Sequence, residues 1–433
     1  MKRRWFSMLL CLLSFTVWVS GCGKPALQED LPTTQAETTV PVESSVETTI
    51  LEPEEIVFPY FTKKQILADY DQMFHMMNMG YPHFGTVKRA FGIDRDEVYN
   101  EFRERVESLE EPILLDEAYA LFDETLAAFG GTGHLWVWPA SAYDAMREAC
   151  LFMGGDYAEA YISISTENVL QTYDWFKERM NEEERARQES VIPDTSEENI
   201  YLERIDDKTA YLKIQTFMPP TREHDYEYLL ALYAEIADCE NLIIDMRNNG
   251  GGDDNYWMNN IVAPNISEPL TKTVYCLFNR KTYSWGYYKD YNKKSVAYKT
   301  ISALPEMTEE ILSEFDSAWM VDITVEPDGD EKAFDGQIYL LVDRSVGSSA
   351  DGFASYAKDT GFATLVGENT GGDGASPLMN MPKALSNTGL VFWFSTMYPL
   401  NGDGSSNTPY GTPPDYYMNE GETALEACLR IIG

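Results

Sequence analysis

The feature that most constrains the fold of this chain is a repeated pattern in its C-terminal half, in which a short apolar run leads into a glycine-rich turn. The runs are NLIIDM, QIYLLVD and ATLVG, at residues 241–246, 337–343 and 363–367. Helical patterns precede the first run at residues 225–236 and the third run at residues 351–359. Continuous apolar runs separated by helices are typical of parallel strands buried on both faces. We therefore expect an α/β fold, with a parallel-sheet core and flanking helices.

The rest of the chain divides into regions of different composition. Residues 57–145 carry apolar side chains three and four positions apart, which predicts a small helical N-terminal domain. Residues 146–200 have a mixed pattern and are interpreted as a connecting segment. The α/β domain is expected over residues 201–433, and an aromatic-rich insertion at about 270–335 is expected to form a hairpin layer or a lid.

The first residues indicate the compartment. Basic residues at positions 2–4 precede an apolar run that is followed by Val-Ser-Gly-Cys22, which predicts a signal peptide over residues 1–21. The ending resembles a bacterial lipobox, which implies cleavage before Cys22 and lipidation of that cysteine; an ordinary signal peptide that ends near a cysteine is the alternative. Residues 22–56 are rich in Thr, Glu, Pro and Ser and predict a disordered tether. We expect an extracytoplasmic lipoprotein anchored to the bacterial cell membrane.

The composition excludes some partners. The formal net charge of −38 opposes binding to a phosphate backbone, so we expect no nucleic-acid partner. The cysteines that follow Cys22 are Cys150, Cys239, Cys276 and Cys428, and none belongs to a CxxC pair. Structural zinc is therefore not expected, while one or two disulfides remain open for an exported chain. No motif indicates a cofactor or a catalytic metal.

A first glycine-rich turn, GGTGH at residues 130–134, contains His134. Of the four histidines in the chain, this one alone is embedded in glycines, which allow close approach of the backbone. Taken alone, a histidine in such a turn is interpreted as a hydrogen-bonded structural residue. No HExxH-type spacing surrounds it, so we do not expect it to bind a metal.

A second turn, RNNGGG at residues 247–252, follows the first apolar run. Consecutive glycines at the carboxyl end of a parallel strand can aim their N–H groups at one point and bind an oxyanion. A phosphate site and a plain strand-to-helix turn are the alternatives. The phosphate site is disfavoured because the turn lacks the lysine of a P-loop.

A third turn, VGSSADG at residues 346–352, follows the second apolar run. Ser348 stands where a strand turns into a helix, which would expose its hydroxyl beside the N–H groups of a helix N-terminus. The alternative is a capping box formed by Ser348 and Asp351.

Taken together, the segments IIDMRNNGGG and GSSADGFASYAKDTGFATLVGENTGG resemble the carboxyl-terminal processing, or tail-specific, peptidases. The resemblance covers about residues 209–415. It implies a Clp protease/crotonase-like α/β fold and a serine-type peptidase, a hydrolase that acts on the peptide bonds of a peptide or protein substrate.

One departure selects the branch of this family. In the tail-specific branch a lysine after the nucleophile helix is the general base, and alignment through GENTGGDG places Asp373 at that position. The tricorn-type branch takes a histidine from a GTSH-like turn upstream, which residues 131–134 match. The resemblance is therefore closest to the tricorn-type branch. It implies that Ser348 is the nucleophile that forms an acyl-enzyme and that His134 is the general base.

The resemblance also implies an oxyanion hole. Its donors would be the N–H groups of Ser349 and of Gly250 or Gly251. Loss of one such donor typically lowers turnover about 10²–10³-fold, so these backbone positions matter as much as many side chains.

An acid that orients the histidine through a bridging serine is a further implication of the resemblance. In this chain Gly133 replaces the bridging serine, and the position of the acid falls at about Thr408. Asp403 and Asp415 are the acidic alternatives in the same region.

These observations make a membrane-anchored, extracytoplasmic serine peptidase the leading hypothesis. The missing serine and acid favour an alternative, a catalytically degenerate lipoprotein that binds peptides or cell wall on the same fold. A metal-dependent hydrolase that uses Asp253, Asp254 or the acidic loop at residues 328–335 is the third hypothesis.

Overall fold

The computed structural model describes residues 56–153, 156–181, 193, 195–218, 221–280, 294–374 and 382–433. The expected signal peptide, Cys22 and nearly all of the expected tether lie outside the described residues. All of the described residues belong to one unit, which holds both a core sheet and a helical region.

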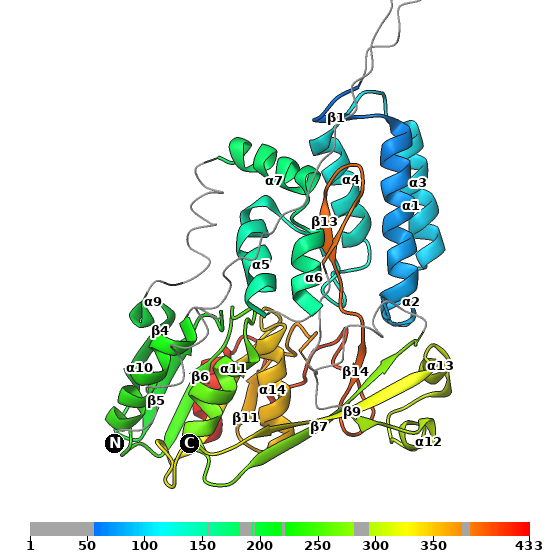
Figure 1. Cartoon of the computed structure of the whole chain (residues 1–433). Helices are drawn as coiled ribbons and strands as arrows, with labels where there is room; N and C mark the ends of the chain where they lie inside the picture. Colours follow the sequence, from blue (N-terminus) through cyan, green and yellow to red (C-terminus); the bar gives the residue numbers. More distant parts are fainter. Residues whose placement is uncertain are drawn as a thin grey trace, which may run out of the picture. The chain divides into compact units, whose positions relative to one another are not determined.

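A six-stranded sheet forms the centre of this unit (Figure 1). Its strands are β4 (Ile200–Arg204), β5 (Thr209–Ile214), β6 (Asn241–Asp245), β10 (Gln337–Val342), β11 (Thr364–Gly367) and β15 (Tyr416–Tyr417). The strand order is β15-β11-β10-β6-β5-β4, and every neighbouring pair is parallel except β4 with β5. The three apolar runs lie side by side as β6, β10 and β11. The predicted parallel-sheet core is therefore confirmed.

Helices cover both faces of this sheet. They include α10 (Arg222–Glu235), α11 (Asp254–Trp257), α14 (Ser349–Thr360) and α15 (Ala424–Ile432). Successive side chains of a strand point to opposite faces. Ile244 of β6 packs in the same cluster as Phe353 of α14, whereas Ile243 packs with Cys428 of α15. Both faces of the strand are buried, which explains why the run is apolar without alternation.

The predicted N-terminal helical region is confirmed. Its first helix begins at Thr62, whose side chain forms a capping box with Gln65. A later helix runs across the boundary expected at residue 145, and further described helices follow it within the segment interpreted as connecting. The helices are α1 (Lys63–Gly80), α2 (Phe84–Phe91), α3 (Arg95–Ser108), α4 (Leu115–Ala127), α5 (Ala140–Met153), α6 (Asp156–Ser163) and α7 (Glu167–Arg179).

A segment from near the C-terminus completes this helical region. Its strands β12 (Lys383–Ala384) and β13 (Val391–Trp393) join β3 (Trp136–Val137) in a three-stranded sheet. The central strand of this sheet is β13. β13 runs among the helices in Figure 1. Asp69 of α1 is fully buried and accepts hydrogen bonds from the N–H and the hydroxyl of Thr388, at 2.7 and 2.8 Å. Phe392 lies in the core formed by α1, α3 and α4.

The described part of the expected insertion forms a hairpin layer. Its sheet has the order β14-β7-β9-β8, and the long strands β7 and β9 pair antiparallel along their whole length. The elements are β7 (Leu270–Phe278), β8 (Lys294–Ser295), α12 (Tyr298–Ile301), α13 (Glu309–Ser313), β9 (Ser317–Val325) and, from later in the chain, β14 (Tyr398–Leu400).

No disulfide joins the cysteines of the described residues. Within the described residues, Cys150, Cys239, Cys276 and Cys428 are buried thiols and form no disulfide. The disulfides that the sequence left open are therefore not part of this structure.

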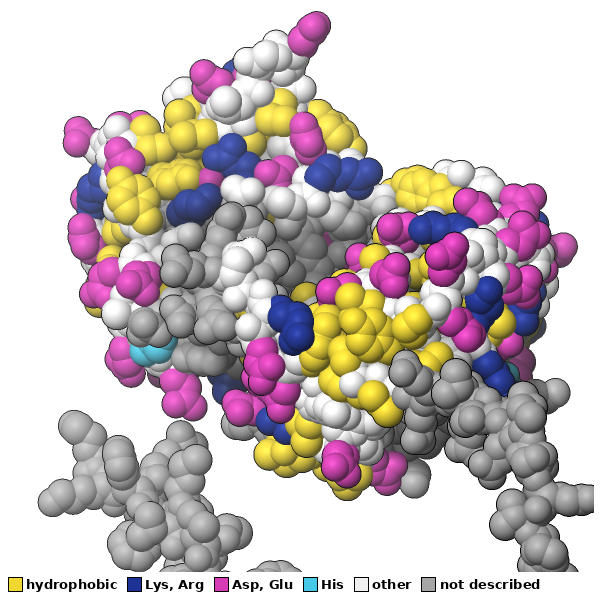
Figure 2. All heavy atoms as spheres, turned by 90° about the horizontal axis from the view of Figure 1, so that it is seen from above, with side chains coloured by type: hydrophobic (Ala, Val, Ile, Leu, Met, Phe, Trp, Pro, Cys, Tyr) yellow, Lys and Arg dark blue, Asp and Glu magenta, His cyan; other side chains and the backbone are white. Residues whose placement is uncertain are grey.

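The surface reflects the acidic composition. Figure 2 shows Asp and Glu side chains scattered over one face, with Lys and Arg between them. Among the described helices, none is both long and apolar enough to cross a bilayer. Likewise, the described residues contain no group of three or more His, Cys, Asp or Glu side chains arranged to hold a metal ion.

Candidate active site

Ser348 occupies the turn between β10 and α14, where it is the residue that precedes the first turn of the helix. Its φ of 52° lies in a region that side chains other than glycine rarely adopt, and such strain gathers at functional sites. The N–H of Ser348 donates to Gly372 O at 3.0 Å. Its hydroxyl makes no capping hydrogen bond to the helix. The capping-box alternative is therefore wrong, and the hydroxyl is left for another partner.

That partner is His134. The Nε2 atom of His134 lies 3.0 Å from Ser348 Oγ, although the two residues are separated by 214 positions in the chain. His134 follows the glycine-rich turn after α4 and has a φ of 55°. The structure thus brings together the two residues that the sequence analysis proposed as base and nucleophile.

A second serine contacts the histidine on its other side. Ser395 Oγ lies 3.3 Å from His134 Nδ1, and the N–H of Ser395 donates to Gly133 O at 2.7 Å. When Nε2 accepts the proton of Ser348, Nδ1 carries a hydrogen that Ser395 Oγ can accept. The sequence analysis missed Ser395, because no motif surrounds it and it reaches the histidine only through the pairing of β13 with β3.

The expected orienting groups lie elsewhere. Asp403 accepts hydrogen bonds from the N–H and hydroxyl of Ser405. Asp415 accepts from Leu365 N–H and pairs with Lys358. Neither carboxylate contacts His134, so these two assignments are corrected. Each carboxylate bonds to the other groups named above, and a motif-based alignment does not detect such contacts.

Thr408 reaches the histidine loop only through Asp373. Thr408 Oγ1 donates to Asp373 Oδ1 at 2.7 Å, and Asp373 Oδ2 accepts from Gly133 N–H at 2.9 Å. The expectation that Thr408 orients His134 directly is therefore replaced by an indirect connection. Asp373 had been noted only as the residue that stands in place of a lysine.

The glycine turn after β6 lies against the turn that carries Ser348. A methyl group on Gly251 would lie 2.8 Å from both Gly347 O and Ser349 N. The N–H of Gly251 donates to Asn249 Oδ1 at 2.9 Å, so Gly251 is not an oxyanion donor. In the described part of the chain, the N–H groups of Gly250 and Ser349 have no protein acceptor. These two remain the candidates for an oxyanion hole.

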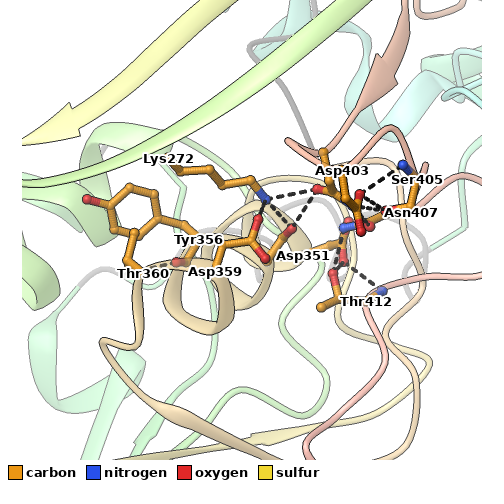
Figure 3. Close-up of polar contacts among 11 residues, drawn as sticks. Lys272, Asp351, Tyr356, Asp359, Thr360, Asp403, Ser405, Asn407 and Thr412 are labelled. Carbon is orange, nitrogen blue, oxygen red and sulfur yellow. Dashed lines mark hydrogen bonds and ion pairs between the residues drawn. The ribbon is translucent and has the colours of Figure 1, made fainter. Parts of the chain in front are cut away.

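Asp351 anchors the N-terminus of α14. Its fully buried carboxylate accepts from Thr370 Oγ1, Thr412 Oγ1 and Gly374 N–H, at 2.5, 2.6 and 2.9 Å. Figure 3 shows Asp351 beside Thr412. Since these partners come from the two loops that follow β11 and β14, one side chain holds both loops against the helix that begins at Ser348.

A buried lysine secures the other end of α14. Lys272 of β7 forms an ion pair with Asp359 at 2.9 Å (Figure 3). Its ammonium group donates to Asn401 Oδ1 at 3.0 Å. It also donates to Ser355 of the helix. The helix that presents Ser348 is therefore fixed to the hairpin layer as well as to the core sheet.

Residues 208–418 match the sequence profile of peptidase family S41. The chain belongs to peptidase family S41. It is a serine-type peptidase, with the mixed α/β Clp protease/crotonase-like fold that the sequence analysis expected.

Two solved structures show how far this S41 fold extends over the chain. A putative peptidase from Parabacteroides merdae is 16% identical, and the match covers 85% of this chain and 96% of that one with a TM-score of 0.52. Mature CPAF is 11% identical, with 82% and 92% covered and a TM-score of 0.51. At these coverages, both structural matches extend beyond residues 208–418. Comparison with curated proteins gives no significant match.

A polar cavity of about 590 Å³ in this S41 peptidase borders α14 but not the serine–histidine pair. Its lining includes Lys272, Asp359, Asn401 and Tyr410. Neither Ser348 nor His134 contributes to it. The cavity is therefore separate from the serine–histidine pair.

The activity of the S41 peptidase is expected to rise with pH through a midpoint below about 6.5, the usual pKa of histidine. Burial lowers the pKa of His134, and the negative charges of Asp373 and Asp351 partly oppose this shift. A general base works in its neutral form, which here persists to more acidic pH than usual. The measurement is kcat/KM across the acid range. A midpoint above pH 7 would contradict this account.

Proposed function

We propose that this chain hydrolyses peptide bonds through an acyl-enzyme on Ser348, with His134 as the general base. The observation that carries the proposal is the 3.0 Å contact between His134 Nε2 and Ser348 Oγ. Two sequence motifs that lie far apart in the chain meet at hydrogen-bonding distance. The strained φ of both residues supports the same interpretation, because a structural contact would not require it.

The geometry supports an ordinary acyl-transfer sequence. His134 Nε2 takes the hydroxyl proton as Ser348 Oγ attacks the carbonyl carbon of the substrate, and it then gives that proton to the leaving amine. The N–H groups of Gly250 and Ser349 would donate to the oxyanion. Water then attacks the ester while His134 accepts its proton, and His134 gives this proton to Ser348 Oγ as the ester bond breaks and the acid product leaves.

The test is covalent labelling of the full chain by a serine-reactive fluorophosphonate, followed by peptide mass spectrometry. We expect an adduct on Ser348 of the wild type, none on Ser348→Ala and strongly reduced labelling of His134→Ala. His75→Ala is the matched control, because His75 is exposed on α1. Absence of an adduct on folded wild-type protein would refute the proposal.

A second candidate function is peptide or cell-wall binding without turnover. It is favoured by one observation: among the described residues, no carboxylate contacts either ring nitrogen of His134. Loss of an acid that contacts the histidine costs about 10⁴-fold in a serine triad. Peptide binding by calorimetry combined with no fluorophosphonate adduct would favour this second function.

We also propose that the peptidase is an extracytoplasmic lipoprotein held at the bacterial membrane by lipidated Cys22. The support is the sequence alone, in which a signal-like segment ends at Val-Ser-Gly-Cys22. Cys22→Ala is expected to move the chain from the membrane fraction to the soluble fraction of cells. Membrane association unchanged by this substitution would refute the anchor.

A further inference from the structure

The acid of the serine–histidine pair is not found at the positions that the family resemblance indicates. We propose that Asp373 takes its place as a positioning residue, because its carboxylate stabilises protonated His134 through the Gly133 peptide group without contacting the imidazole. The inference rests on the proposed function of Ser348 and His134. It assigns to a loop aspartate the task that an acid in direct contact with the histidine performs in a serine triad.

Two hydrogen bonds fix this carboxylate. Oδ2 accepts from the N–H of Gly133, the residue that precedes His134, at 2.9 Å. Oδ1 accepts from the Thr408 hydroxyl at 2.7 Å. Asp373 itself has a φ of 65°, a left-handed conformation that Asp tolerates better than most residues. Both carboxylate oxygens of Asp373 therefore accept a hydrogen bond, and one of the two donors is a backbone N–H of the loop that carries His134.

Further contacts hold the histidine loop in place beside this carboxylate. Ser395 N–H donates to Gly133 O at 2.7 Å, and Tyr81 Oη donates to Thr132 O at 2.8 Å. A side chain on Gly133 would collide with the ring of His83, at 2.4 Å. Glycine is therefore required at the position where the resemblance leads one to expect a bridging serine, and Ser395 supplies that hydroxyl from another strand.

The other titratable groups that face His134 are Asp351 of α14 and His83, which precedes α2. Asp351 is fully buried, and burial raises the pKa of its carboxyl group. Its three close donors come from the loops that it anchors. His83 is buried, and burial lowers its pKa to about 4, so it is neutral near pH 7. Asp373 is the carboxylate that bonds to the histidine loop itself.

A negative charge close to a buried imidazole favours the imidazolium, because little water screens the interaction. The imidazolium forms when His134 accepts the serine proton. Asp373 would therefore act at the step in which Ser348 attacks, and its removal should lower both the proton affinity of His134 and the rate of acylation.

The experiment follows the histidine directly. Full-length wild type, Asp373→Asn and Asp373→Gly are labelled at the histidine rings and titrated by NMR, and His134→Ala assigns the signal. Asn keeps an oxygen acceptor for Gly133 N–H, and Gly suits the left-handed φ, so each variant removes the charge with a different structural risk. We expect the midpoint of His134 to fall by about 0.5–1 pH unit in both variants. The signals of His75 and His224 should stay unchanged and report correct folding.

The rate of fluorophosphonate labelling at Ser348 is measured in parallel, and it should fall about three- to tenfold in both variants, the equivalent of 0.5–1 pKa unit. A midpoint of His134 that does not move in either folded variant would overturn the inference, whatever happens to the rate. A lost rate with an unmoved midpoint would show that Asp373 is only a structural anchor. Because the titration needs no activity, a wild type that fails to label would count against the proposed function and not against this inference.

Discussion

Ser348→Ala and His134→Ala are each expected to lower kcat for peptide hydrolysis about 10⁵–10⁶-fold, since neither member of a serine–histidine pair works alone. The alanine at position 348 has no oxygen to form the ester. The alanine at position 134 leaves the serine without a base at 3.0 Å. Combining the two substitutions should cost little more than either one, because both remove the same step. The measurement is hydrolysis of a fluorogenic peptide library by each purified variant.

Ser313→Ala and His75→Ala are the matched controls for these variants. Both side chains are exposed, on α13 and α1. They should retain wild-type rates. If Ser348→Ala kept a substantial part of the activity in a preparation free of other peptidases, the nucleophile would have to be a different group.

Gly251→Ala is expected to lower kcat at least 10²-fold, comparable with the loss of an oxyanion donor. The added methyl group would lie 2.8 Å from Ser349 N and 2.9 Å from Ser348 Cβ. The φ of Gly251, 103°, also disfavours any side chain. The glycine turn would have to move away from Ser348 and carry the N–H of Gly250 with it. Because the change alters the transition-state contacts, KM should change less than kcat.

The control for Gly251→Ala is Gly361→Ala, at the C-terminal end of α14. Gly361 has a φ of 72°, but a methyl group there would meet no atom within 4 Å. Gly361→Ala therefore lowers the free energy of unfolding by about 1 kcal/mol through the left-handed backbone, without a steric collision. Gly361→Ala should lower the melting temperature slightly and leave kcat unchanged. Equal losses of kcat in the two variants would show that backbone strain, and not contact with the serine turn, causes the effect.

The sequence predicted those parts of the molecule that local patterns determine. Each continuous apolar run became a buried strand, and each glycine-rich turn lies where its neighbours approach closely, as Gly251 does against Ser349. The meeting of His134 and Ser348 was predicted only through the family resemblance of the two segments that contain them. Their roles in catalysis stay predictions until the variants are measured.

Contacts made by unremarkable sequence could not be predicted. Ser395 reaches His134 because β13 pairs with β3, and two-residue strands leave almost no pattern. On sequence spacing, the carboxylates of Asp403 and Asp415 were also candidate partners of His134. In the structure they accept hydrogen bonds from other backbone N–H groups instead. Asp373 lay within a recognised motif, but only the fold shows that its carboxylate turns toward Gly133.

The pairing of β13 with β3 has a consequence for folding of the chain during its synthesis. The helical region at the start of the chain lacks part of its core, including Phe392, and the partner of Asp69 until residues 388–392 have been synthesised. Contacts between such distant positions form slowly and late. Strand β3, which follows His134, likewise cannot form its pairing until β13 has been synthesised. A nascent or truncated chain that ends before this hairpin would carry the histidine in an unfinished setting, so the hydrolytic machinery is assembled only when translation is nearly complete.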